Sequence, residues 1–335
     1  MQSSDDSKTI SRRNLLSATA GISVAGLIGA TDATAAPPIA AGQSKPANRV
    51  LRIAHLTDVH VQPELRATAG MTACLRHVQA QADPVDLILF GGDCIMDALS
   101  QTLERTKTQW DLWQAVLKAE CSLPWKACIG NHDIWGWKKA TLPAVRNNPL
   151  FGKQWALEPL KLDKRYYGFE RAGWKFIVLD STHAAIHFRA YQAKLDDEQL
   201  DWLAKELAAT PATTPVLVLS HIPILSVSAF LDGDNAKGSD WNVPGAWMHL
   251  DAAKLTALFH KHGNVKVCLS GHMHMVDTAQ YLGTRYYCNG AVCGGFWEGK
   301  YHQFDEGYAL VNLYDNGDSQ CEYVNYGWKA EAAAG

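Results

Sequence analysis

The sequence lacks a long hydrophobic run, an excess of basic residues and any closely paired cysteines. Its weakly apolar stretch near the N-terminus ends by residue 30 and is too short and too rich in Gly and Ser to cross a bilayer stably. With 31 Lys and Arg against 34 Asp and Glu, the formal net charge is −3. This balance argues against nucleic acid or an anionic membrane as the main partner. We therefore expect no transmembrane segment in the mature protein and no specific nucleic-acid partner.

The eight cysteines form no C-x-x-C motif and no cluster along the chain. Cys128 and Cys268 lie inside apolar runs, where a thiol behaves as a small hydrophobic group. An oxidising compartment would permit disulfides, but the sequence does not assign their pairing. We expect mostly free, buried thiols.

The sequence does contain a recognisable N-terminal signal. Residues 11–16 read S-R-R-N-L-L, a mild apolar run follows, and residues 33–36 read A-T-A-A. A charged start, a short apolar segment and an A-x-A-like cleavage site predict a secretory signal. The paired arginines resemble a twin-arginine export signal over residues 1–35, with a linker over 36–49. The prediction implies the twin-arginine export machinery as a partner and a periplasmic or secreted protein; the alternative is an unprocessed N-terminal tail.

The rest of the chain alternates strand-like and helix-like segments. Helices are expected where apolar residues recur every three or four positions, over 65–82, 98–119, 197–209 and 251–262. Strands are expected over 50–56, 85–90, 124–129, 166–170, 174–179, 215–220, 265–269, 285–289, 307–313 and 321–326. The alternation runs without a break, which predicts one α/β domain over 50–328 and a tail over 329–335.

Five of the expected strands end in short polar clusters. These clusters are T-D-V-H from residue 57, G-G-D from 91, G-N-H-D from 130, S-H-I-P from 220 and S-G-H-M-H from 270. Each cluster taken alone is also explained as a turn or a helix cap. However, ligands of open α/β sheets bind at the carboxyl ends of strands. The coincidence of all five clusters at such ends therefore favours a single site.

The residue types in these clusters are metal ligands. Carboxylate, imidazole and amide oxygen suit divalent or trivalent first-row metals, and no thiol is needed. The candidates are Asp58, His60, Asp93, Asn131, His221, His272 and His274. These are more ligands than one ion requires. If Asp93 bridges two ions, each ion receives four protein ligands and keeps positions open for water and substrate.

The ordered motifs D-x-H, G-D, G-N-H-D, an isolated His after a strand and G-H-x-H resemble the calcineurin-like metallophosphoesterase superfamily. The resemblance extends from about residue 50 to 328. It implies a four-layer α/β/β/α sandwich with two mixed β-sheets and a pair of ions, Mn, Fe or Zn, at the strand ends. In this pattern Asp58, His60 and His274 hold one ion, Asn131, His221 and His272 hold the other, and Asp93 bridges.

The resemblance also implies a reaction. Its members hydrolyse phosphodiesters or phosphomonoesters by attack of a metal-bound hydroxide. His132 matches the histidine that contacts the scissile phosphate and is proposed as general acid, and Asp133 matches the residue that orients it. The expected substrate is a phosphoester of a small molecule or lipid headgroup. Because His60 is present and Met96 stands where purple acid phosphatases have Tyr, the sequence is more similar to the class III cyclic-nucleotide phosphodiesterase branch.

Two alternatives to a phosphodiesterase remain open at this point. The first is a phosphomonoesterase, and the second is a non-catalytic protein of the same fold that binds a phosphorylated ligand. Tryptophans follow two of the clusters, namely Trp135, Trp137, Trp241 and Trp247, and they either form an aromatic rim or pack under long loops. Met273 is expected to pack into the fold, while its neighbours His272 and His274 reach different ions.

Overall fold

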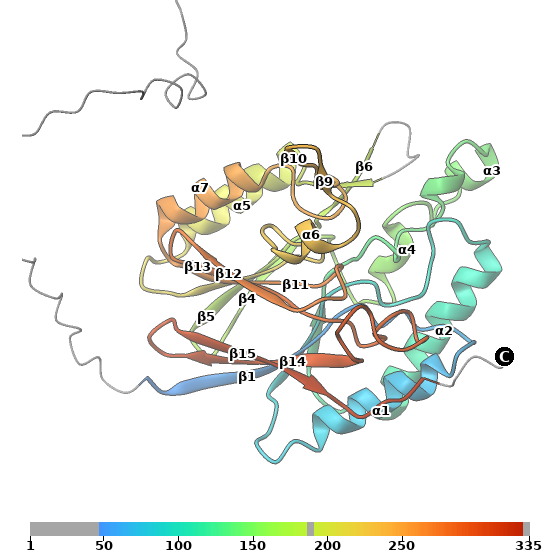
Figure 1. Ribbon diagram of the computed structural model, residues 1–335, viewed down its shortest axis with the longest axis horizontal. Helices are drawn as coiled ribbons and strands as arrows, with labels where there is room; N and C mark the ends of the chain where they lie inside the picture. The colour runs from blue at the N-terminus through green and yellow to red at the C-terminus, as the bar shows by residue number, and fades with distance from the viewer. Residues whose placement is uncertain (1–46, 186–190, 331–335) are drawn as a thin grey trace, which may run out of the picture. The chain divides into compact units, whose positions relative to one another are not determined.

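Two mixed β-sheets form the centre of the fold in the computed structural model, which describes residues 47–185 and 191–330 (Figure 1). The first sheet has the strand order β15-β14-β1-β2-β3. Strands β1, β2 and β3 are parallel, and β14 and β15 add antiparallel pairs. Their bounds are β1 (Arg49–Leu56), β2 (Leu87–Phe90), β3 (Trp125–Ala127), β14 (Gly307–Tyr314) and β15 (Ser319–Asn325).

The second sheet has the order β12-β13-β11-β8-β5-β4. Its four inner strands are parallel, and both edge strands are antiparallel to their neighbours. The strands are β4 (Tyr167–Arg171), β5 (Trp174–Val178), β8 (Val216–Leu219), β11 (Val265–Ser270), β12 (Asp277–Tyr281) and β13 (Thr284–Cys288). Strand β12 was not expected from the sequence, because D-T-A-Q-Y is polar and lies half-exposed at the edge of the sheet.

Four longer helices cover the outer faces of the sheets (Figure 1). They are α1 (Ala67–Gln79), α2 (Leu103–Glu120), α5 (Asp197–Ala209) and α7 (Ala252–His262). Helix α2 begins five residues later than 98, because Thr102 caps it by accepting a hydrogen bond from the N–H of Arg105. Helix α5 has the expected bounds, and Asp196 caps it in the same way through Gln199.

Alternating side chains of each strand divide between two apolar cores. In β1, Ile53 packs between the two sheets, whereas the next residue, Ala54, packs under α1 and α2. In β8, Leu217 faces the first sheet, whereas Val218 packs under α5 and α7. A strand buried on both faces reads as a continuous apolar run, as these strands do. The layers are therefore α/β/β/α, and the predicted fold is confirmed.

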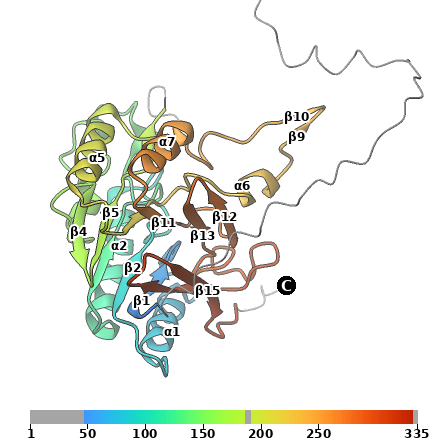
Figure 2. The same cartoon turned by 90° about the vertical axis from the view of Figure 1, so that its left-hand side faces the viewer.

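Shorter elements fill the loops that follow the strands. Two small hairpins are β6 (Thr182–Ala184) with β7 (Tyr191–Ala193), and β9 (Ala236–Lys237) with β10 (Asp240–Trp241). The second hairpin projects away from the sheets (Figure 2). The remaining helices are the 3-10 helix η2 (Trp137–Lys139) and the single turns α3 (Pro143–Arg146), α4 (Gln154–Leu157) and α6 (Ser228–Leu231). These elements were not expected, since each is too short to show a period in the sequence.

The cysteines bear out the expectation of free thiols. All eight are unpaired, and Cys121 and Cys321 alone are only partly buried. Within the described ranges, none of the helices combines the length and apolarity that a bilayer span requires. The predicted export signal and linker, residues 1–49, fall almost wholly outside the described residues. The predicted domain boundaries at 35, 49 and 328 therefore stay predictions.

Candidate metal centre

The five polar clusters converge at one edge of the two sheets. Strands β1, β2 and β3 are parallel neighbours, and so are β8 and β11, so the loops after them lie at matching ends. The structure brings together all seven candidate ligands, which we call the ligand cluster: Asp58, His60, Asp93, Asn131, His221, His272 and His274. Each is buried or nearly so.

One part of the ligand cluster gathers around Asp58 and His60. Asp58 Oδ1 lies 3.4 Å from His274 Nε2 and 3.9 Å from His60 Nε2. His60 Nε2 lies in turn 3.6 Å from Asp93 Oδ2. The ligand atoms of Asp58, His60 and Asp93 all lie within 4.8 Å of one another, and His274 adjoins Asp58. This part of the ligand cluster is therefore a candidate transition-metal site.

The other part gathers on the far side of Asp93. His221 Nε2 lies 3.2 Å from Asp93 Oδ2 and 3.0 Å from Asn131 Oδ1. His272 completes the group, with its ligand atom within 4.8 Å of those of Asp93 and His221. Asp93 Oδ2 thus faces both parts of the ligand cluster. His272 and His274, although only one residue separates them, lie in different parts.

Neighbouring groups hold the ligand atoms in position. His221 Nδ1 donates to the carbonyl of Gly91 at 2.8 Å, and His274 Nδ1 donates to the carbonyl of Gly294 at 2.6 Å. Each contact turns Nε2 toward the ligand cluster. Asp58 Oδ2 accepts from the hydroxyl of Thr57 at 2.6 Å and from the N–H of His272 at 2.9 Å, which leaves Oδ1 for the site.

The backbone of the ligand cluster is strained. Five of its seven residues have positive φ without being glycine: Asp58 at 54°, His60 at 47°, Asp93 at 51°, His272 at 70° and His274 at 55°. Such conformations cost roughly 1–3 kcal/mol each and persist only where the surroundings enforce them. Five such residues at one place lower the stability of the fold, so their presence there indicates a functional site.

The glycines of the motifs allow close approach of the loops. A Cβ on Gly271 would lie 1.9 Å from Thr57 Oγ1, and a Cβ on Gly130 would lie 2.1 Å from Asp93 Oδ1. Neither position tolerates a side chain. The G in G-N-H-D and in S-G-H-M-H is therefore required to bring loops from different strands together.

The residues of the ligand cluster fit a metal ion. His60 is fully buried, yet within the described part of the chain neither of its ring nitrogens has a hydrogen-bond partner, and Asp58 Oδ1 has none either. Buried polar atoms without partners are costly, and a bound cation would satisfy Asp58 Oδ1 and one ring nitrogen of His60. Burial lowers the pKa of His60 and of His272 to about 3, so both imidazoles are neutral and able to ligate a metal.

His221 behaves differently from the other two histidines. Burial alone would lower its pKa, but the carboxylate of Asp93 outweighs burial and raises the pKa to about 9. Without a metal, a proton on His221 compensates the charge of Asp93. A cation bound there has to displace that proton.

His132 and Asp133 lie beside the ligand cluster and have distinct partners. His132 is partly exposed, and its Nδ1 donates to the carbonyl of Met96 at 2.6 Å. Asp133 is buried and accepts from the N–H groups of Cys94 at 2.9 Å and Gly130 at 2.8 Å. Asp133 therefore binds the loops that carry Met96 and His132, and any orienting effect on His132 passes through this backbone.

The ligand cluster opens into a cavity of about 210 Å³, which His132 also lines. Two larger hollows, of about 430 and 450 Å³, lie near Trp125 and several lysines but contain none of the candidate ligands, so size alone does not locate the site. We call the remaining side chains of the smaller cavity, Met273 apart, the cavity wall: Tyr191, Asp232, Trp247, Phe296 and Tyr301.

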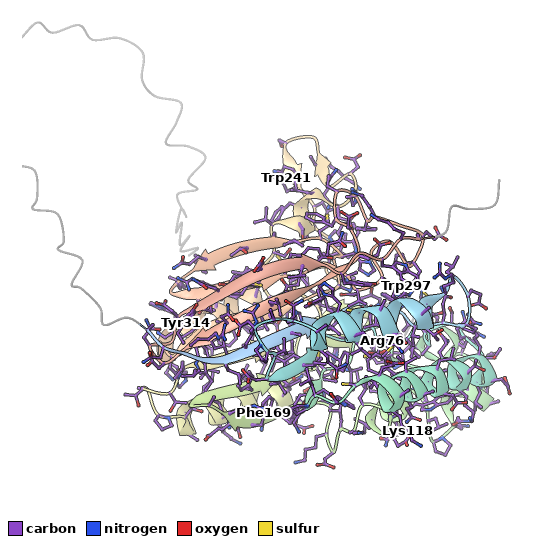
Figure 3. The ribbon with its side chains drawn as sticks, turned by 90° about the horizontal axis from the view of Figure 1, so that it is seen from below. Arg76, Lys118, Phe169, Trp241, Trp297 and Tyr314 are labelled. Atoms are coloured by element: carbon purple, nitrogen blue, oxygen red, sulfur yellow. The ribbon has the colours of Figure 1, made fainter. Side chains whose placement is uncertain are left out.

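Sequence reasoning found only part of the cavity wall. Trp247 belongs to it, whereas Trp135 and Trp137 are 3% and 7% exposed and pack in the core, and Trp241 is 59% exposed on the projecting hairpin (Figure 3). Met273 packs with Ala229, Met275 and Cys288, as expected.

Asp232, Tyr191 and Tyr301 were missed, because single residues in long loops carry no periodic signal. Sequence reasoning also missed Cys293. Its sulfur lies within 4.8 Å of the ligand atoms of His60 and His274. Burial raises the pKa of this thiol, which disfavours the thiolate form that binds metals.

Known proteins resemble this chain in both sequence and structure. A 3′,5′-cyclic-nucleotide phosphodiesterase from Nostoc sp. is 23% identical over 278 residues, covering 80% of this chain and 89% of that protein. The 3′,5′-cyclic adenosine monophosphate phosphodiesterase of Escherichia coli is 24% identical over 254 residues, covering 73% and 78%. A crystal structure of a dimetal phosphatase from Danio rerio superposes with a TM-score of 0.53 at 16% identity, covering 82% and 99% of the two chains.

The family profile described as calcineurin-like phosphoesterase matches residues 51–276, two thirds of the chain. The matched segment contains all seven members of the ligand cluster together with His132 and Asp133. The chain therefore belongs to the calcineurin-like phosphoesterase family and is a metal-dependent phosphoester hydrolase.

Proposed function

We propose that the protein is an exported phosphodiesterase that hydrolyses small phosphoesters with two ions held by the ligand cluster. The observation that carries this proposal is the sharing of one carboxylate, since Asp93 Oδ2 lies 3.6 Å from His60 Nε2 and 3.2 Å from His221 Nε2. Asp58, His60 and His274 would hold one ion, and Asn131, His221 and His272 the other. When bound, two such ions lower the pKa of water and stabilise the charge that develops on a phosphoryl group.

His132 is proposed as the proton donor. A carbonyl oxygen only accepts, so the contact with Met96 fixes the hydrogen of His132 on Nδ1. The other nitrogen, Nε2, then carries the transferable proton when the ring is protonated. His132 lines the cavity, where Nε2 would donate this proton to the ester oxygen as its bond to phosphorus breaks.

The choice of metal is proposed from the donor set. Imidazole nitrogens with carboxylate and amide oxygens suit Mn, Fe or Zn, and geometry does not separate these three. Mass spectrometry of the purified protein would test this choice. Two ions per chain drawn from these metals are expected, and fewer than one would support the non-catalytic alternative instead.

Diester rather than monoester hydrolysis is proposed from the relatives, whose names describe cyclic-nucleotide phosphodiesterases. The dimetal phosphatase resembles this chain only in fold. Phosphomonoesterase activity is the second candidate function. The test compares bis-nitrophenyl phosphate, nitrophenyl phosphate and 3′,5′-cyclic AMP with Mn-loaded protein. A higher kcat/KM for the diesters is expected, and a preference for the monoester would overturn the proposal.

Export by the twin-arginine route is proposed from the segment S-R-R-N-L-L at residues 11–16. Folded proteins use this route, which suits an enzyme that acquires metal before export. Replacing both Arg12 and Arg13 by Lys should leave the protein in the cytoplasmic fraction of its host. Unchanged fractionation of the double variant would contradict this assignment.

A further inference from the structure

The cavity wall contains one carboxylate that does not belong to the ligand cluster. Asp232 follows α6, and its side chain is 15% exposed. Asp232 Oδ1 accepts hydrogen bonds from the hydroxyl of Tyr301 at 3.0 Å and from His302 Nε2 at 3.2 Å. The buried side chain of Asn235 anchors the turn by donating to the carbonyls of Asp232 at 2.8 Å and Ala229 at 3.0 Å.

A negative charge in this place opposes the binding of a bare phosphate. Carboxylate and phosphate repel each other, and the repulsion is stronger in a cavity than in open water. Among the described residues, both side-chain hydrogen bonds of Asp232 go to Oδ1, and Oδ2 receives none. The carboxylate therefore retains the capacity to face a positive group of the substrate.

Aromatic side chains accompany this carboxylate. Tyr301 and Phe296 lie 5.4 and 4.7 Å, ring to ring, from His274, and Trp247 shares the cavity with them. Aromatic faces attract ammonium groups, and most strongly where water is excluded. A carboxylate next to several aromatic faces is the chemical environment that suits an ammonium cation.

The size of the cavity favours a small organic group. Its volume of about 210 Å³ lies below the roughly 300–1,000 Å³ typical of pockets that hold drug-sized ligands. A phosphate with a short amino alcohol therefore fits within the volume of this cavity.

We propose that the cavity wall selects phosphoesters whose organic group carries an ammonium cation. Asp232 supplies the opposite charge, while Trp247 and Tyr301 supply aromatic faces. The inference rests on the proposed function, because it names the substrate class for the same site. It goes further in assigning a recognition role to Asp232, a residue outside all five motifs.

The test uses two phosphates of the same shape. Phosphorylcholine and 3,3-dimethylbutyl phosphate differ in one atom, a positively charged nitrogen in place of carbon. Titration calorimetry with the Mn-loaded full chain gives the Kd of each. The unaltered protein should bind phosphorylcholine at least about tenfold more tightly.

The variant Asp232→Asn keeps an acceptor for Tyr301 and His302 but removes the charge. Its affinity for phosphorylcholine should fall, while its affinity for 3,3-dimethylbutyl phosphate should stay or rise, because a repulsion is lost. The ratio of the two Kd values should therefore approach one. A purely structural role of Asp232 would weaken both probes alike. Asp234→Asn, an exposed carboxylate in the same loop, is the matched control and should leave the ratio unchanged.

Equal affinities in the unaltered protein would overturn the inference, and so would parallel weakening of both probes in Asp232→Asn. Absence of binding by protein that still hydrolyses bis-nitrophenyl phosphate would also overturn it. These outcomes differ from failure of the proposed function, in which metal-loaded protein hydrolyses no phosphoester at all. Should Asp232→Asn not fold, Trp247→Leu provides the second variant, with an expected severalfold drop in the ratio.

Discussion

The ligand cluster and the cavity wall line the same cavity, yet they are built in different ways. Each member of the ligand cluster follows the end of a parallel strand within a few residues, and five of the seven have positive φ. The cavity wall comes from longer connections, such as the loop after α6 that carries Asp232 and Trp247. The sheets thus fix the positions of the proposed metal ligands, whereas the longer loops supply the residues proposed to distinguish substrates.

This comparison predicts that substitutions in the two regions differ in kind. Changes in the ligand cluster should alter metal content, and changes in the cavity wall should alter substrate preference with metal content unchanged. The following predictions run from the largest expected effect to the smallest.

Asp93→Asn should have the largest effect. Its Oδ2 faces both parts of the ligand cluster, so the loss of its charge weakens both ions together. We expect fewer than two ions per chain by mass spectrometry and a fall in kcat/KM for bis-nitrophenyl phosphate of about 1,000-fold or more. The control is Asp201→Asn on the exposed face of α5. Normal metal content in Asp93→Asn would contradict the shared position of this carboxylate.

His272→Ala and His274→Ala should each remove one ion. The two side chains lie in different parts of the ligand cluster, which predicts about one ion per chain in each variant. The loss of several kcal/mol of charge stabilisation lowers turnover by roughly 100-fold or more. Loss of both ions in either single variant would contradict the assignment of the two histidines to different ions.

His132→Ala should slow turnover according to the leaving group. A general acid contributes about 10²–10⁴-fold where the departing oxygen needs a proton, and little where the leaving group is nitrophenolate. Comparing an alkyl ester with a nitrophenyl ester of the same phosphate measures this difference. Equal losses for both esters would show that His132 acts in another way, and metal content should stay at the normal value.

Metal affinity should rise with pH across the neutral range and through pH 9. The pKa of His221 is raised to about 9. Burial opposes a proton on His274, but Cys293 and Asp58 beside it raise the pKa of that imidazole as well, so below pH 9 the metal-free protein carries a proton on both. A metal displaces the proton from each of these two imidazoles, and affinity therefore increases by up to about tenfold per pH unit for each proton released. His60 and His272 add no proton release above about pH 4, since their pKa values are about 3. Calorimetry in buffers of different ionisation enthalpy counts the released protons.

Trp247→Leu should have the smallest effect. An aromatic contact contributes about 0.5–1.5 kcal/mol, so KM should rise severalfold with kcat and metal content little changed. Trp241→Leu on the exposed hairpin is the matched control and should leave KM unaltered. A loss of bound metal in Trp247→Leu would remove the distinction between the two regions.

The sequence predicted the ligand cluster better than the cavity wall, for a physical reason. Asp58, Asp93 and His221 each follow a run of buried apolar residues, and such runs mark strand ends in any α/β fold. The layers could be predicted for the same reason, because strands buried on both faces read as continuous apolar segments. The metal assignments of the individual residues stay predictions.

The cavity wall could not be predicted, because its residues meet only in the folded chain. Asp232 and Tyr301 are 69 positions apart, and their hydrogen bond depends on two irregular loops. Likewise, the sequence left the same two alternatives open for Trp135 and Trp247, an aromatic rim or packing under a loop. In the folded chain Trp135 packs in the core, whereas Trp247 lines the cavity. Short hairpins and single helical turns are too short to show a recurring pattern of apolar residues in the sequence.

The central claim is that two ions share Asp93, with His272 and His274 on different ions. The most direct measurement is a crystal structure of Mn-loaded protein with anomalous data collected at the metal edge. The account predicts two anomalous peaks about 3.5–4 Å apart, with Asp93 between them, His274 at one and His272 at the other. A single peak, or both histidines bound to the same ion, would contradict it.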